Sequence, residues 1–167
     1  MIIAIDGRSG GGKSTLAGTL EKKLGLSVVH MDDFFLQPHQ RCVERLSQPG
    51  GNVDYERVLE EVLEPLKRGE SPVTYRCFDC KTMSFGETKT IDGSKPVVVE
   101  GSYSCHPKLK EYYDLTIFLD VDGETQIQRL RERVGEERLQ MFKEKWIPLE
   151  EAYFEAFRVK ENCDIQK

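Results

Sequence analysis

The chain has 167 residues, of which 38% are hydrophobic and 32% are charged, and its formal net charge is -5. This length predicts one domain, residues 1–167, with the composition of a water-soluble globule. No apolar run approaches the roughly 18 residues that cross a bilayer, and no run of Lys and Arg supplies a face for a polyanion, so we expect a cytoplasmic protein without a membrane or nucleic-acid partner. The sequence leaves open whether the chain forms a homo-oligomer.

Short apolar runs alternate with helical patterns along the chain. The runs that suit buried parallel strands are Ile2–Ile5, Leu26–Met31, Val97–Val99, Leu115–Val121 and Cys163–Ile165. Helical spacing is found in Ser14–Leu24, Asp54–Lys67, Thr125–Met141 and Leu149–Val159, while the polar segment Pro72–Gly93 suits an irregular or hairpin excursion. The alternation predicts an α/β fold with a mainly parallel five-stranded sheet flanked by helices, and ligands at the carboxyl ends of its strands.

The first turn after the first predicted strand reads GRSGGGKST. It matches the phosphate-loop pattern G-x-x-x-x-G-K-[ST] between a strand and a helix, where backbone N–H groups curl around a phosphate chain. Lys13 would reach the β- and γ-phosphates and the Ser14 hydroxyl would ligate Mg²⁺, so we expect ATP and Mg²⁺ as cofactors. The alternative is a glycine-rich turn capped by Ser14 or Thr15. The expected nucleotide-binding residues are Gly7, Ser9, Gly10, Gly11, Gly12, Lys13, Ser14 and Thr15.

A phosphate loop indicates a nucleotide but not a reaction. Asp120-Val121-Asp122-Gly123 resembles the acidic motif of a GTPase, but no N-K-x-D follows it, so Asp120 is interpreted as a strand-end or cap residue. A mechanical ATPase is usually larger. A small-molecule kinase remains, with a nucleotide-binding regulator that has no acceptor as the alternative from another class.

Two acidic segments follow predicted strands. His30-Met31-Asp32-Asp33-Phe34-Phe35 places adjacent carboxylates before two aromatic rings, which suits a general base at the mouth of a pocket, although either acid could cap a turn. Val97-Val98-Val99-Glu100 is an apolar run with one terminal acid, the form in which the acid holds Mg²⁺, although a strand-end acid without function is common.

Three arginines lie in the fourth predicted helix. Arg129 and Arg133 share a face at a spacing of four residues, and Arg131 is displaced around the helix. Arg129 and Arg133 could close over ATP as a lid, or they could pair with neighbouring glutamates on a solvated face. Spacing alone leaves both readings open.

Taken together, these motifs resemble the uridine kinase group of phosphate-loop kinases, which includes nicotinamide riboside kinase and is related to phosphoribulokinase and bacterial pantothenate kinase. The resemblance rests on GRSGGGKST, HMDDFF, NVDYERVLEEVLEPLKRG, VVVEGSYS and LTIFLDVDGETQIQRLRER, in the family's order. It implies a P-loop NTPase fold with a small lid, roughly residues 123–147. It also implies transfer of the ATP γ-phosphate to a hydroxyl, most often the 5′-hydroxyl of a nucleoside, with pantothenate or nicotinamide riboside as alternative acceptors.

The resemblance also assigns roles to individual residues. It implies that Asp32 accepts the hydroxyl proton, that Asp54 in NVD grips the ribose hydroxyls, and that Glu100 is the metal-binding acid. The lid arginines would be Arg129 and Arg133, with Lys13 completing the catalytic set. The family reads N-F-D-H-P where this chain has Asn52-Val53-Asp54-Tyr55-Glu56, and Tyr75 and Phe78 are the candidates for contacts with the base.

The five cysteines, at positions 42, 77, 80, 105 and 163, do not suggest a disulfide framework. Cys77 and Cys80 form a C-x-x-C, but a structural zinc normally recruits a second pair. We therefore expect reduced, incidental thiols, with a metal or redox role for Cys77 and Cys80 as the minor alternative.

Overall fold

Five parallel strands form the central sheet in the computed structural model, which describes residues 1–167. They are β1 (Ile2–Gly7), β2 (Ser27–His30), β5 (Val97–Glu100), β6 (Leu115–Leu119) and β7 (Ile165–Gln166), in the order β2-β5-β1-β6-β7. The register places His30 beside Glu100 and Ile5 beside the same residue on the other side. The predicted α/β class is confirmed, and the last strand lies slightly later in the chain than expected.

The two faces of the sheet carry different cores. Alternate side chains point to opposite faces of a strand, so Ala4 and Ile5 of β1 belong to separate clusters. Helix α1 (Lys13–Leu24) covers the smaller cluster, in which Ala17 is fully buried. The larger cluster lies on the opposite face of the sheet. It includes residues of the hairpin described below and aromatic residues of the last helix, among them Tyr153.

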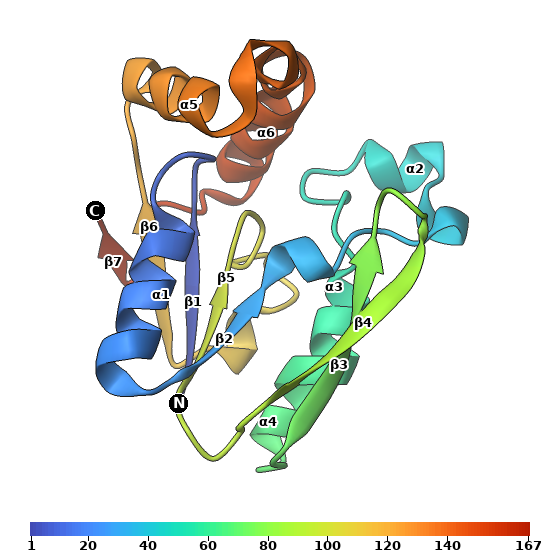
Figure 1. Cartoon of the computed structure of the whole chain (residues 1–167), viewed down its shortest axis with the longest axis vertical. Coiled ribbons are helices and arrows are strands. Elements are labelled where there is room, and N and C mark those ends of the chain that lie inside the picture. The colour runs from blue at the N-terminus through green and yellow to red at the C-terminus, as the bar shows by residue number, and fades with distance from the viewer.

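The segment Pro72–Gly93 is a two-stranded antiparallel hairpin, β3 (Val73–Asp79) and β4 (Ser84–Ile91), separate from the main sheet (Figure 1). Val73 and Tyr75 of β3 are buried, whereas Thr74 between them is exposed. The predicted helix Asp54–Lys67 is found as α3 (Tyr55–Val58), one π-helical turn (Leu59–Leu63) and α4 (Glu64–Lys67), and it packs beside β3. Short helical turns connect β2 to this unit at Met31–Asp33, Pro38–Gln40 and α2 (Val43–Leu46).

The predicted lid region is helical. Helix α5 (Gly123–Met141), a π-helical turn (Phe142–Trp146) and α6 (Ile147–Phe157) follow one another, and Figure 1 shows α5 and α6 above the ends of the strands. Gly135 interrupts α5 at φ 78 and ψ 168, so the helix is kinked there. The helix-capping acid is Asp122, whereas Asp120 lies at the end of β6 and pairs with Arg8 and Lys160. None of the helices is long and apolar enough to traverse a lipid bilayer.

Candidate active site

A cavity of about 1040 Å³ opens at the carboxyl ends of the parallel strands, between the sheet and the α5–α6 unit. Loops that are distant in the sequence line it because parallel strands end at the same edge of a sheet. The lining includes Ser9, Gly10, Gly11, Gly12, Lys13, Ser14, Thr15, Asp32, Phe35, Asn52, Glu100, Ser102, Tyr103, Asp120, Arg129, Arg133, Phe142, Trp146 and Glu150.

The turn between β1 and α1 has the geometry of a phosphate cradle. Gly12 adopts φ +92, and Gly7 adopts φ +136, where an added Cβ would lie 2.0 Å from the Leu119 carbonyl oxygen. The Lys13 ammonium donates to the carbonyl oxygens of Gly7 (2.7 Å) and Arg8 (3.0 Å), which folds the side chain along the loop. Because α1 begins at Lys13, its N-terminal N–H groups face the cavity, and the site fits a nucleotide phosphate chain.

A hydroxyl and a carboxylate meet beside this turn. The Ser14 hydroxyl lies 3.1 Å from both carboxylate oxygens of Glu100, whose Oε1 is 2.5 Å from His30 Nδ1. The hydrogen bond to Glu100 raises the pKa of His30. Magnesium is usually held by one or two protein oxygens together with substrate phosphates, so Ser14 and Glu100 fit that ion. No cluster of three or more His, Cys, Asp or Glu side chains elsewhere could hold a metal.

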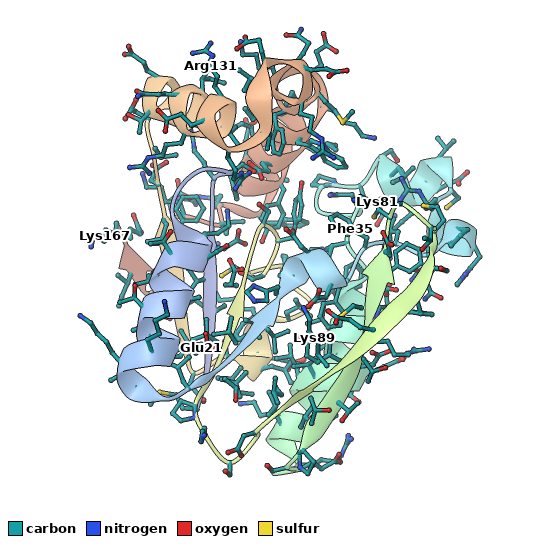
Figure 2. All side chains as sticks on the ribbon, viewed as in Figure 1. Glu21, Phe35, Lys81, Lys89, Arg131 and Lys167 are labelled. Atoms are coloured by element: carbon teal, nitrogen blue, oxygen red, sulfur yellow. The ribbon has the colours of Figure 1, made fainter.

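The adjacent acids Asp32 and Asp33 have different surroundings. The exposed side chain of Asp32 lines the cavity, where desolvation by the cavity walls and then the charge of Glu100 raise its pKa. Asp33 points away toward the hairpin, where its carboxylate accepts hydrogen bonds from Lys89 Nζ (2.9 Å) and from the Tyr75 hydroxyl (3.3 Å). Figure 2 shows Lys89 on the hairpin side facing the end of β2. Of these two acids, only Asp32 is therefore available to a molecule bound in the cavity.

Two residues predicted to contact the acceptor do not line the cavity. Asp54 is fully buried, and its carboxylate accepts from Arg57 Nε (3.0 Å) and Gln37 Nε2 (3.2 Å). Tyr75 is buried against Phe34 and Asp33. A backbone bridge between Phe35 and Val53 instead brings Asn52, two residues before Asp54, to the cavity wall.

The arginines of α5 lie on two different faces of the helix. Arg129 lines the cavity and donates to the carbonyl oxygen of Gly10 (3.0 Å), and Arg133 lines it with its guanidinium 5.7 Å from the centre of the Phe142 ring. Arg131 forms an exposed ion pair with Glu136 (2.8 Å), and Figure 2 shows it at the outer edge of α5. The pair at a spacing of four residues is the one that faces the phosphate loop.

Sequence reasoning missed Glu150, a buried acid of α6. Its carboxylate accepts from the Ser9 backbone N–H (3.1 Å), the Ser9 hydroxyl (2.5 Å) and the Ser102 hydroxyl (2.7 Å). It thereby ties α6 to the phosphate loop and to the loop after β5. No motif surrounds Glu150, so the sequence offered no signal for this contact.

Asp6, at the end of β1, was also missed. The fully buried carboxylate accepts from the backbone N–H groups of Gly7 (2.7 Å) and Cys105 (2.9 Å) and from the Tyr153 hydroxyl (2.9 Å). Burial raises its pKa to about 6. An acid that closes an apolar strand directly before the phosphate loop was a signal that could have identified it.

Comparisons with known proteins identify a family and show a shared fold. Residues 2–140 match the model of the phosphoribulokinase / uridine kinase family. A protein from Bacillus stearothermophilus described as a possible uridine kinase has a TM-score of 0.73 and 22% identity, over 99% of this chain and 87% of that one. A D-glycerate 3-kinase from Cryptococcus neoformans has a TM-score of 0.60 and 16% identity, over 89% of this chain and 77% of that one.

The family match spans most of the chain, and it includes the phosphate loop, Asp32, Glu100 and the cavity-facing arginines. The chain therefore belongs to the phosphoribulokinase / uridine kinase family, a family of small-molecule kinases.

Proposed function

We propose that the protein transfers the γ-phosphoryl group of ATP to a hydroxyl of a small molecule, with the 5′-hydroxyl of a ribonucleoside as the first candidate acceptor. The observation that carries the proposal is that the phosphate loop, the Ser14–Glu100 pair and the Asp32 carboxylate line one cavity. A kinase needs all three functions in one place, whereas a protein that only holds a nucleotide has no use for the carboxylate.

Each residue then has a distinct task. The phosphate-loop N–H groups and Lys13 bind the phosphates, while Arg129 and Arg133 offset the negative charge that spreads over the transferring group. Ser14 and Glu100 would hold Mg²⁺, which supplies charge neutralisation to the phosphates. Asp32 accepts the proton of the acceptor hydroxyl, and its raised pKa makes it a better base than an ordinary carboxylate.

The lining of the cavity and the position of Asp54 bear on which acceptor is bound. Phe35, Phe142 and Trp146 give the cavity aromatic walls on which a nucleobase could stack, and Asn52 adds an amide. However, the enclosure of Asp54 favours a second candidate class, a hydroxylated metabolite without a ribose, such as pantothenate. A nucleoside would use Asp54 only if its contacts with Arg57 and Gln37 rearranged.

The test is a screen of ADP release with uridine, cytidine, 2′-deoxyuridine, nicotinamide riboside and pantothenate as separate acceptors. The first candidate predicts that ribonucleosides accelerate ADP release, and a role of Asp54 in ribose binding further predicts that 2′-deoxyuridine is a poorer acceptor than uridine. Acceleration by pantothenate alone would support the second class. Lys13→Met serves as the inactive control, since the lysine contacts the phosphates. Slow ADP release that no hydroxyl compound accelerates would contradict both and indicate a nucleotide-binding regulator.

A further inference from the structure

A second, smaller cavity of about 200 Å³ lies away from the candidate active site and shares no lining residue with it. Two cysteines line it, Cys105 from the loop after β5 and Cys163 from the segment before β7. Thr116 of β6 and Phe157 of α6 are also part of its wall. The cavity therefore gives a small molecule a place beside two otherwise buried thiols.

The two sulfur atoms are in contact although the residues are far apart in the chain. Their Sγ–Sγ distance is 3.7 Å, and 58 positions separate them. Both backbones are held in place: the Cys105 N–H donates to Asp6 (2.9 Å), and Asp164, next to Cys163, accepts from the Thr116 backbone N–H (2.8 Å) and hydroxyl (2.7 Å). The fold, and not local sequence, thus keeps these thiols together.

The other cysteines are placed differently. Cys42 and Cys80 are exposed, and Cys77 is buried next to Asp33, where burial raises its pKa to about 11. The C-x-x-C segment singled out in the sequence therefore holds one exposed and one buried thiol, and the pair in sulfur contact is Cys105 and Cys163.

We propose that Cys105 and Cys163 form a site of reversible oxidation, at which hydrogen peroxide converts the two thiols into an intramolecular disulfide. The Cys163 thiolate attacks one peroxide oxygen and the O–O bond breaks, so that Cys163 becomes a sulfenic acid. The departing hydroxide takes up the proton that the Cys163 thiol released and leaves as water. Cys105 then attacks that sulfur. The S–O bond breaks, and the leaving hydroxide takes the Cys105 proton. In sum, two thiols and one peroxide give one disulfide and two waters.

The division of roles follows from the surroundings of each thiol. The hydrogen bond between the two thiols lowers the pKa of Cys163, which favours its thiolate, whereas the same interaction and burial raise the pKa of Cys105. Cys163 is thus the attacking residue and Cys105 the resolving one. The disulfide would join the loop that carries Ser102 and Tyr103, both on the wall of the larger cavity, to the segment before β7.

The experiment uses the full chain with Cys42→Ser and Cys80→Ser, which removes the two exposed thiols and leaves Cys77, Cys105 and Cys163. The protein is treated with hydrogen peroxide, quenched with catalase, unfolded in iodoacetamide without reductant, and mapped by mass spectrometry. The expected result is a cross-linked peptide containing Cys105 and Cys163, a fall from three alkylated cysteines to one, and full reversal by dithiothreitol. The measurement needs neither an acceptor nor activity, so it is independent of the proposed function.

Two matched variants in the same background sharpen the result. Cys77→Ser should leave the cross-link unchanged, whereas Cys105→Ser should stop the reaction at a sulfenic acid on Cys163 that dimedone traps. Full alkylation of both Cys105 and Cys163 after peroxide, or sulfinic acid on Cys163 without any cross-link, would overturn the proposal. If Cys105→Ser fails to fold, the peptide map of the parent protein still decides the question.

Discussion

Asp32 and Asp33 are neighbours in the chain, but their environments differ. Asp33 is held by Lys89 and Tyr75, so its charge belongs to the packing of the hairpin against the sheet. Asp32 forms no ion pair, and its exposed side chain faces the cavity beyond the end of β2, where desolvation by the cavity walls and then the charge of Glu100 disfavour its charged form. A carboxylate kept in a costly environment beside a phosphate loop is typical of a catalytic group.

The raised pKa of Asp32 predicts a specific pH dependence. A general base must be ionised, so acceptor-dependent kcat/KM should fall as the pH drops through a value above the ordinary 3.8 of an aspartate. Ionisation of this acid also costs folding free energy, because its pKa is higher in the folded than in the unfolded state. Asp32→Asn should therefore abolish the acidic limb of the profile while leaving the melting temperature equal or higher at neutral pH. A lower melting temperature would indicate a structural residue instead.

For Asp54, unlike Asp32, we expect substitution to lower the stability of the fold. Its carboxylate is fully buried and bonded to Arg57, and removing one partner of a buried ion pair costs about 3–5 kcal/mol of folding free energy. We expect Asp54→Asn to lose a large part of this amount in urea unfolding. Glu70→Gln, which breaks the exposed pair with Arg68, is the matched control and should change stability little. Equal stability of the two variants would show that Asp54 is not a structural anchor.

Glu150 connects helix α6 to the phosphate loop. Because the carboxylate accepts from both the backbone and the hydroxyl of Ser9, it fixes the part of the loop that precedes the glycines. Glu150→Gln removes one acceptor and places an amide donor against a donor, so we expect KM for ATP to rise about 10-fold. Glu155→Gln is the matched control, since Glu155 lies on the same helix with an exposed side chain. Unchanged KM in Glu150→Gln would remove α6 from the nucleotide site.

The kink in α5 rests on one residue. Gly135 adopts φ +78 with nothing within 4 Å of an added Cβ, so Gly135→Ala would meet backbone strain and no clash. Such strain costs about 1–3 kcal/mol, so the variant should be destabilised. Gly18 also has open space around it but lies in the regular helix α1, where Gly18→Ala should stabilise by about 1 kcal/mol. Thermal unfolding of both variants should therefore give shifts of opposite sign, and two shifts of the same sign would contradict this reading of the kink.

Local patterns in the sequence predicted the strands and helices because each apolar run and helical face is encoded by contiguous residues. The phosphate loop was predictable for the same reason. The strand order was not, and it is this order that pairs β2 with β5 and brings Asp32 close to Glu100.

The directions of the side chains could not be predicted from the sequence either. The segment Asn52-Val53-Asp54 turns Asp54 inward as the N-cap of α3 and leaves Asn52 at the cavity, although both residues are polar. Glu150 could not be found because its partners, Ser9 and Ser102, lie in two distant loops that only the fold brings to α6. Among the acids, Asp32 and Glu100 line the cavity because they lie at the carboxyl ends of strands of the central sheet, whereas Asp54 begins a helix outside that sheet.

In the proposed mechanism, Asp32 removes a proton from an acceptor hydroxyl while the phosphate loop independently holds ATP. The most direct measurement follows the transfer of label from γ-labelled ATP to the acceptor, beside ATP affinity, in the wild type, Asp32→Asn and Asp33→Asn. Asp32→Asn should lose about 10²–10⁴-fold in kcat with ATP affinity retained, and Asp33→Asn should lose much less. Transfer by Asp32→Asn at the wild-type rate would contradict the claim, and a larger loss in Asp33→Asn would assign the proton to the other carboxylate.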